Sequence, residues 1–173
     1  MIRGLIRCVT RCVIGRALRS GVARLCQDQP VADDCPFCLI AAGRLAASVV
    51  HESERVLAFM DIDPVTPGHV LVVPREHLAG LADLPDPIGG EMFAVARAVA
   101  VALRRTDLRC EGVNLFFADG EAALQEVPHA HLHVIPRFEG DGFAIAGRWG
   151  SDPSRAELDA HAASIRRALT APS

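Results

Sequence analysis

Three histidines alternate with apolar residues in the segment 129–136, which reads His-Ala-His-Leu-His-Val-Ile-Pro. Successive side chains of a β-strand point to opposite faces, so this alternation predicts a strand with His129, His131 and His133 on one face. Neighbouring histidines would then lie roughly 6–7 Å apart, a spacing that suits a row of imidazoles along a phosphate chain. A single metal ion could not readily bind all three from one straight strand. With only seven histidines in 173 residues, a solvated face that is histidine-rich by chance is a poor explanation.

The remaining hydrophobic patterns outline one α+β domain. Apolar runs of strand length are bounded by Gly, Pro and polar turns, and they are interspersed with helical patterns. This order favours a mostly antiparallel, five-stranded sheet with one long helix and a C-terminal helix. The expected strands are 49–51, 56–61, 69–75, 112–117 and 129–136, and the expected helices are 37–43, about 92–103 and about 154–169, the last with Ser151 or Asp152 as its N-cap.

Charge divides the chain into a basic leader and an acidic body. The first 27 residues contain six arginines and no acid, whereas the remainder carries 12 arginines against 21 acidic residues. A polar, proline-containing stretch at 27–34 is typical of a linker. We therefore expect residues 1–30 to be an extension outside the fold and residues 31–173 to form the domain. The leader is either an amphipathic targeting or membrane-surface helix or a dispensable extension.

Composition limits the classes of function. The chain has no lysine, which excludes a lysine nucleophile or Schiff base. A net charge of −3 gives no general signature of nucleic-acid binding. No apolar run approaches the ~20 residues of a membrane-spanning helix, and arginines interrupt the leader too often for a secretory signal. We expect a cytoplasmic protein with no nucleic-acid or membrane partner.

Cysteines occur at positions 8, 12, 26, 35, 38 and 110. Cys35 and Cys38 form a Cys-x-x-Cys pair, which alone is weak evidence because a metal site needs about four ligands. A redox pair is the alternative interpretation. We treat the other four cysteines as structural or incidental.

The histidine segment resembles the signature of the histidine-triad (HIT) family. Residues 57–77 resemble the upstream nucleotide-binding strand pair of that family, and Cys-Pro-Phe-Cys at 35–38 resembles the usual bacterial opening of the domain. Three blocks in this order and spacing are highly specific, and together they cover about residues 35–138. The resemblance implies the HIT fold, and a homodimer whose sheets extend across the interface with one nucleotide bound per subunit.

The resemblance also implies catalytic roles. His131 would be the nucleophile that attacks phosphorus and forms a nucleotidyl-histidine intermediate. An imidazole with an unperturbed pKa of ~6.5 is available for this at neutral pH. His133 would hydrogen-bond phosphate oxygens or the leaving group, and His69 would orient the nucleophile.

Substrate contacts follow from the same resemblance. Asp61 matches the residue that holds the ribose hydroxyls, although a turn-capping aspartate before Pro64 would look the same in sequence. An apolar base pocket and a phosphate-cradling loop complete the site, and the pocket residues would suit an ordinary core equally well. Glu126 stands where the phosphoramidase branch carries a serine, which weakens the case for phosphoramidase chemistry. The expected substrate-binding residues are Phe37, Ile40, Asp61, Ile62, Leu124, Gln125, Glu126 and Val127.

Zinc is the implied cofactor. In zinc-containing members of the family, the two cysteines are joined by the histidine of Pro-Arg-Glu-His and by the first triad histidine. The corresponding set here is Cys35, Cys38, His77 and His129. Four protein ligands close the coordination shell, so the expected ion is structural rather than catalytic.

The favoured function is hydrolysis of a dinucleoside polyphosphate or related nucleoside phosphate, with release of a nucleoside monophosphate. Two alternatives remain at this level. One is a nucleoside phosphoramidase or nucleotidyltransferase. The other is a non-catalytic, zinc-stabilised nucleotide-binding module.

Overall fold

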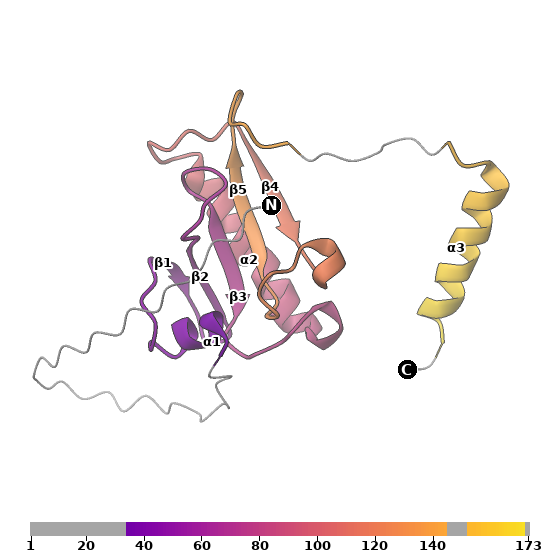
Figure 1. The fold of residues 1–173 in the computed structure, drawn as a ribbon, viewed down its shortest axis with the longest axis horizontal. Coiled ribbons are helices and arrows are strands. Elements are labelled where there is room, and N and C mark those ends of the chain that lie inside the picture. The colour runs from indigo at the N-terminus through magenta and orange to yellow at the C-terminus, as the bar shows by residue number, and fades with distance from the viewer. Residues whose placement is uncertain (1–33, 145–151, 172–173) are drawn as a thin grey trace, which may run out of the picture. The chain divides into compact units, whose positions relative to one another are not determined.

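The computed structural model describes residues 34–144 and 152–171 (Figure 1). The expected leader, residues 1–30, lies outside this part of the chain, as does Ser151. Within these two ranges, five strands and three α-helices follow one another, with short 3₁₀ helices at Leu81–Asp83 and Glu121–Ala123. The elements are α1 (Pro36–Ala41), β1 (Val49–Glu52), β2 (Val56–Met60), β3 (Val70–Pro74), α2 (Asp86–Leu103), β4 (Gly112–Phe117), β5 (Leu132–Arg137) and α3 (Arg155–Leu169).

The five strands form one sheet in the order β1-β2-β3-β5-β4. Each neighbouring pair is antiparallel. The α+β class and the antiparallel five-stranded sheet predicted from the sequence are therefore confirmed. Strand β3 lies at the centre, where it brings the segment that precedes it alongside the histidine strand β5.

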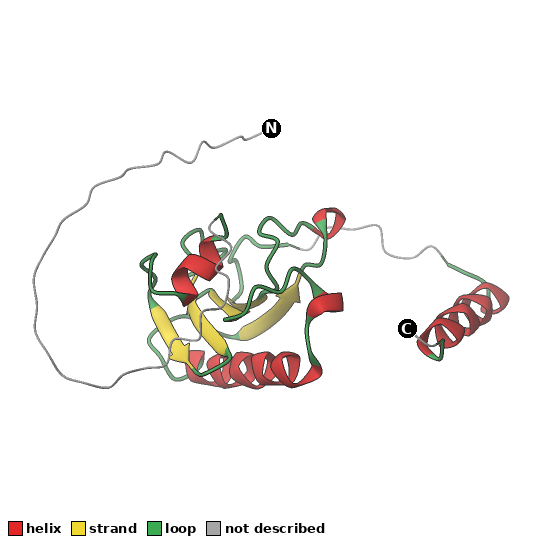
Figure 2. Ribbon diagram, turned by 90° about the horizontal axis from the view of Figure 1, so that it is seen from below, coloured by secondary structure: helices red, strands yellow, loops and turns green. Residues whose placement is uncertain are grey.

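Helices α1 and α2 cover opposite faces of the sheet, as Figure 2 shows. Alternate residues of β2 and β3 enter two separate clusters, because strand side chains alternate between faces. Val56, Ala58, Val70 and Val72 pack with α2. The cluster on the α1 face contains Cys35, Phe37, Cys38, Leu57, Phe59, Leu71 and Val73. The α1 face is also the face on which the histidines lie.

Three predicted boundaries were wrong. Helix α2 begins at Asp86 rather than at about 92, and Pro87 lies in its first turn, where a missing N–H leaves no helical hydrogen bond unmade. Strand β5 begins at Leu132 rather than at 129, because the Ala130 N–H donates to the Leu78 carbonyl oxygen at 2.6 Å instead of joining the ladder. Helix α3 has Ser154 as its N-cap instead of Ser151 or Asp152. Its hydroxyl accepts from the Glu157 amide while the Glu157 carboxylate accepts from the Ser154 amide, a reciprocal capping box.

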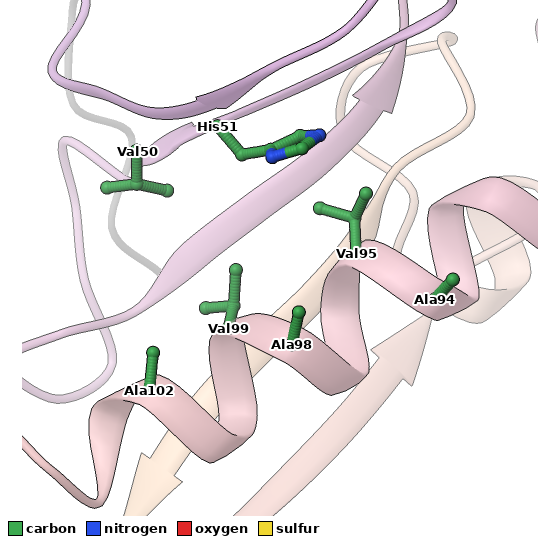
Figure 3. Close-up of a pocket in the computed structure, with 7 residues that line it drawn as sticks. All are labelled: Val50, His51, Ala94, Val95, Ala98, Val99 and Ala102. Atoms are coloured by element: carbon green, nitrogen blue, oxygen red, sulfur yellow. The ribbon is translucent and has the colours of Figure 1, made fainter.

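A shallow groove lies between β1 and α2, on the face opposite α1 (Figure 3). Its lining is apolar apart from His51, and the side chains are Val50, His51, Ala94, Val95, Ala98, Val99 and Ala102. None of the three alternating histidines lines it. Within residues 34–144 and 152–171, no helix has the length and apolar character needed to cross a bilayer.

Candidate functional site

The three alternating histidines share one face, as predicted, although the first two precede the strand. The Phe37 ring of α1 lies edge-on to both His129 and His131, with centroid distances of 5.7 and 5.3 Å. The rings of His131 and His133 are 4.8 Å apart. An extended backbone keeps the alternation of side chains even where no ladder forms. The sequence pattern therefore predicted the common face correctly and the strand length incorrectly.

His131 is held by the backbone of its neighbour. Its Nδ1–H donates to the carbonyl oxygen of His129 at 2.6 Å. In the neutral ring this places the lone pair on Nε2, because an imidazole carries one N–H and one acceptor nitrogen. The side chain is buried, so its ring orientation is constrained by packing as well. The reactive nitrogen of a histidine nucleophile would be this Nε2.

His133 is paired with His69 rather than standing alone. The Nε2 of His69, which lies just before β3, is 2.9 Å from the Nδ1 of His133. Burial, reinforced by the neighbouring imidazoles His131 and His69, lowers the pKa of His133 to about 4. Burial likewise lowers the pKa of His69, against the opposing effect of the Asp61 carboxylate. Both rings are therefore neutral at pH 7, which is the state in which one can donate to the other.

This placement modifies the role expected for His69. Its ring contacts the third histidine of the row, while the orientation of His131 comes from the His129 carbonyl. Asp61 lies on the other side of His69, with Oδ2 at 3.3 Å from Nδ1. The two nitrogens of His69 thus face different partners, so these residues form a chain and not a set of ligands around one ion.

Cys35, Cys38, His77 and His129 come together in a second cluster, as predicted. The Cys35 sulfur lies 3.4 Å from Nδ1 of His129, and the Cys38 sulfur lies 3.2 Å from Nδ1 of His77 and 3.5 Å from Nδ1 of His129. A tetrahedral ion with Zn–S of ~2.3 Å and Zn–N of ~2.05 Å would separate sulfur and nitrogen ligands by about 3.5 Å. The arrangement therefore fits a tetrahedral zinc site of two sulfurs and two nitrogens.

The surroundings of His129 also suit a metal ligand. Its Nε2–H donates to the Pro74 carbonyl oxygen at 2.9 Å, which leaves Nδ1 unprotonated and facing the cysteines. Burial lowers the pKa of this histidine to about 4, so it stays neutral. Helix α1 supplies both sulfurs, since Cys35 is its N-cap and Cys38 lies in its first turn.

The predicted base-pocket residues lie on the histidine face. Phe37 is buried, with its ring 5.6 Å from that of Phe59, and Ile40 and Val127 pack against the same cluster. By contrast, several other predicted contacts are exposed to solvent. These are Ile62 (99% exposed), Leu124 (78% exposed) and Glu126.

The loop expected to cradle phosphate is braced by its own hydrogen bonds. The Gln125 side chain accepts from the Gly120 amide at 2.8 Å and donates to the Ala79 carbonyl at 2.7 Å. Leu124 has a φ of 69°, in the left-handed region, and its amide donates to Glu121. The amides of Leu124 and Gln125 and the Gln125 side chain therefore already have partners within the protein, and their contact with phosphate stays a prediction.

Sequence reasoning missed two neighbours of the histidine row. Phe116 of β4 is paired with His133 across the ladder, and their rings are 5.8 Å apart. The Val65 amide N–H donates to Nδ1 of His69 at 3.3 Å. The His69 contact depends on the fold of the loop before β3, and the Phe116 contact depends on strand register. Neither left a signal in the spacing of the residues.

Comparisons with known proteins bear on this site. The sequence model of the HIT domain family matches residues 42–140. "Protein hit" of Bacillus subtilis is 38% identical over 127 residues, which cover 73% of this chain and 87% of that protein. The crystal structure of a member of the HIT family from B. subtilis has a TM-score of 0.75 at 35% identity and covers 81% of this chain and 100% of that one. A Zn-bound histidine triad family protein from Mycobacterium smegmatis has a TM-score of 0.62 at 39% identity and covers 78% and 97%.

Proposed function

This chain belongs to the HIT domain family, whose members are in general nucleotide hydrolases and transferases, and we propose that it hydrolyses a dinucleoside polyphosphate or related nucleoside phosphate. The observation that carries the proposal is the hydrogen bond from Nδ1 of His131 to the His129 carbonyl. It leaves Nε2 of His131 with a lone pair on the face that holds His133.

Two displacements at phosphorus make up the reaction. Nε2 of His131 forms a bond to phosphorus while the bond to the leaving nucleotide oxygen breaks, and that oxygen takes the electron pair. Water then attacks the same phosphorus and loses a proton to the solvent. The P–N bond breaks, its electron pair returns to Nε2 of His131, and a nucleoside monophosphate leaves. His133 would hydrogen-bond the phosphate oxygens or the leaving group during both steps.

Nucleotide contacts follow the histidine face. We assign the ribose hydroxyls to Asp61, whose carboxylate can accept two hydrogen bonds. Phe37 and Ile40 support an apolar surface for the base. Ile62, Leu124 and Glu126 are exposed and would contact a bound nucleotide from the solvent side, while Gln125 and Val127 are half-buried.

Zinc is the proposed structural cofactor, held by Cys35, Cys38, His77 and His129. Bound there it would supply a closed tetrahedral cross-link between α1 and the start of the histidine segment. A reducing cytoplasm, the proposed location, keeps such thiols free to bind metal. The zinc-bound relative from M. smegmatis supports this assignment.

A homodimer built through β4 is the proposed assembly. Strand β4 lies at the end of the sheet, and Leu115 and Phe116 on it are 39% and 40% exposed. An exposed apolar edge strand invites pairing with another chain. A second copy pairing edge to edge would extend both sheets, and because Phe116 lies beside His133 the interface would adjoin the active site.

Substrate preference tests the hydrolase assignment against phosphoramidase activity. A leaving amine must be protonated, and an ionised Glu126 carboxylate can only accept hydrogen bonds. Diadenosine polyphosphates should therefore be turned over with a kcat/KM at least about tenfold above that of nucleoside 5′-phosphoramidates. In Glu126→Ser, phosphoramidate turnover should rise while polyphosphate turnover changes little. The reverse preference in the wild type would favour the phosphoramidase, and tight binding without turnover would favour a binding module.

The candidate site lies downstream of residues 1–30. The family match begins at residue 42, and the candidate ligands begin at Cys35. Deleting residues 1–30 should leave nucleotide turnover within about twofold of that of the full chain, because the site lies entirely downstream. Zinc content and dimer mass should also be unchanged. Aggregation of the truncated protein, or loss of most of its activity, would assign the leader to the folded domain.

A further inference from the structure

Nδ1 of His69 faces two groups that require opposite protonation of the same atom. The Asp61 carboxylate oxygen lies at 3.3 Å and can only accept, so it needs a proton on Nδ1. The Val65 amide nitrogen also lies at 3.3 Å and can only donate, so it needs a lone pair there. One nitrogen cannot satisfy both partners at once. The ring therefore has two competing hydrogen-bonding states.

The nitrogen of His69 that carries the proton determines which nitrogen of His133 carries its proton. Both rings are neutral at pH 7, and Nε2 of His69 is 2.9 Å from Nδ1 of His133. A proton on Nδ1 of His69 leaves its Nε2 to accept, so His133 donates from Nδ1 and presents a lone pair at Nε2. A proton on Nε2 of His69 reverses the bond, and His133 then presents an N–H at its own Nε2. The two states differ at Nε2 of His133, the atom expected to hydrogen-bond the phosphate oxygens or the leaving group.

Hydrogen bonds keep the competing groups together: Oδ1 of Asp61 accepts from the Asp63 N–H at 3.0 Å, while Oδ2 faces His69. The Asp61 N–H donates to the His69 carbonyl at 3.0 Å, which ties the end of β2 to the start of β3. The Asp61 side chain is 17% exposed, whereas that of His69 is only 2% exposed. A solute that binds the carboxylate can therefore reach Asp61 without entering the space around His69.

We propose that the ribose of the bound nucleotide selects the state of this histidine pair, an inference that rests on the proposed function. Without nucleotide, the charged Asp61 carboxylate is the stronger partner and holds the proton on Nδ1 of His69. When the ribose diol occupies that carboxylate, Val65 becomes the partner of Nδ1. His69 then donates from Nε2, and His133 presents an N–H to the phosphate.

The change between the two states conserves the number of protons on the histidine pair. One proton leaves Nδ1 of His69 to water, one moves from Nδ1 of His133 to Nε2 of His69, and one is taken from water at Nε2 of His133. No net charge is gained. The resulting N–H can stabilise a phosphate oxygen or protonate a leaving group, whereas a lone pair at the same place would repel it. Asp61 is thus a positioning residue that couples ribose recognition to the rate of the chemical step.

The kinetic test compares the phenyl ester of AMP with its 2′,3′-dideoxy form. In the wild type the dideoxy substrate should lower kcat by about tenfold or more, since a positioned proton donor contributes about 10²–10⁴-fold. In Asp61→Ala the two substrates should show the same kcat as each other, because Val65 alone then faces Nδ1 whether or not a ribose diol is present. Asp63→Asn, which removes an exposed carboxylate two residues away, should behave as the wild type does.

A direct measurement follows the tautomers without turnover. In protein with ¹⁵N-labelled histidine, AMP should move the His69 proton from Nδ1 to Nε2, and 2′,3′-dideoxy-AMP should leave it on Nδ1. Asp61→Asn provides a second variant in which the AMP-induced change should shrink. A dideoxy effect confined to KM, with unmoved tautomers, would overturn the coupling and leave the proposed hydrolase intact. Absence of turnover with every nucleotide would instead remove the proposed function, and the tautomer measurement would still decide the coupling.

Discussion

Replacing His131 with alanine should lower nucleotide turnover by about 10³-fold or more, the loss expected when a covalent nucleophile is removed. The Nδ1–H of His131 is fixed by the His129 carbonyl at 2.6 Å, so its Nε2 is both unprotonated and oriented. His133 should not substitute, because its ring lies 4.8 Å from that of His131 and so away from the position of the attacked phosphorus. Steady-state turnover of a diadenosine polyphosphate measures the loss.

The same prediction requires a covalent adduct on one residue. Wild-type protein quenched with acid-free denaturant during turnover should carry one nucleotidyl group on His131 by peptide mass spectrometry. His51→Ala is the matched control, because His51 is an exposed histidine of β1 in the groove on the opposite face. It should retain full activity and the adduct. An adduct on another residue, or an active and folded His131→Ala protein, would contradict the assignment.

Most of the fold could be predicted because its signals are local. Period-two alternation determined which face carries His129, His131 and His133, and apolar runs between turn residues located the other strands. The order of elements was enough to favour an antiparallel sheet. These predictions were confirmed because strand alternation and apolar patterning depend on neighbouring residues and not on distant partners.

What could not be predicted depends on distant partners. The start of β5 was misplaced because the Ala130 amide bonds to Leu78, more than fifty residues away in sequence. The sequence could not show whether His69 contacts His131 or His133, because both lie on the same face of the segment. The bonds of Gln125 to Gly120 and Ala79 arise from loop geometry around the left-handed Leu124, a conformation that sequence does not predict for leucine.

His129 connects the two clusters of the site. Its side chain joins the cysteines, while its carbonyl oxygen accepts from His131. The Pro74 carbonyl fixes the ring of His129 from the other side. The metal cluster and the candidate nucleophile therefore share one residue, and a disturbance of the first reaches the second through the covalent bonds of His129 and one hydrogen bond.

Removal of the proposed zinc should produce the largest loss of stability in this protein. Helix α1 is only six residues long, and it carries both cysteines of the cluster, so the ion would add a cross-link between this short helix and the rest of the domain. An ion present at 1,000 times its Kd stabilises the folded state by about 4.1 kcal/mol. For a chain of this size each kcal/mol shifts the melting temperature by about 2–4 °C, so Cys35→Ser or a strong chelator should lower it by about 10 °C.

The matched control and the metal content complete the test. The purified protein should contain about one zinc per chain, a stoichiometry set by the single Cys2His2 site, and Cys35→Ser should lose it. Cys110→Ser replaces a half-buried thiol that donates to the Gly112 carbonyl outside the cluster, and should keep both metal and stability. In the metal-free variant, the fraction of folded protein should fall more than the turnover measured per folded molecule. The reason is that Nδ1 of His131 still donates to the His129 carbonyl oxygen. A native protein without zinc, whose Cys35 and Cys38 are readily alkylated and whose melting temperature is unchanged by chelators, would show that the cluster does not bind metal.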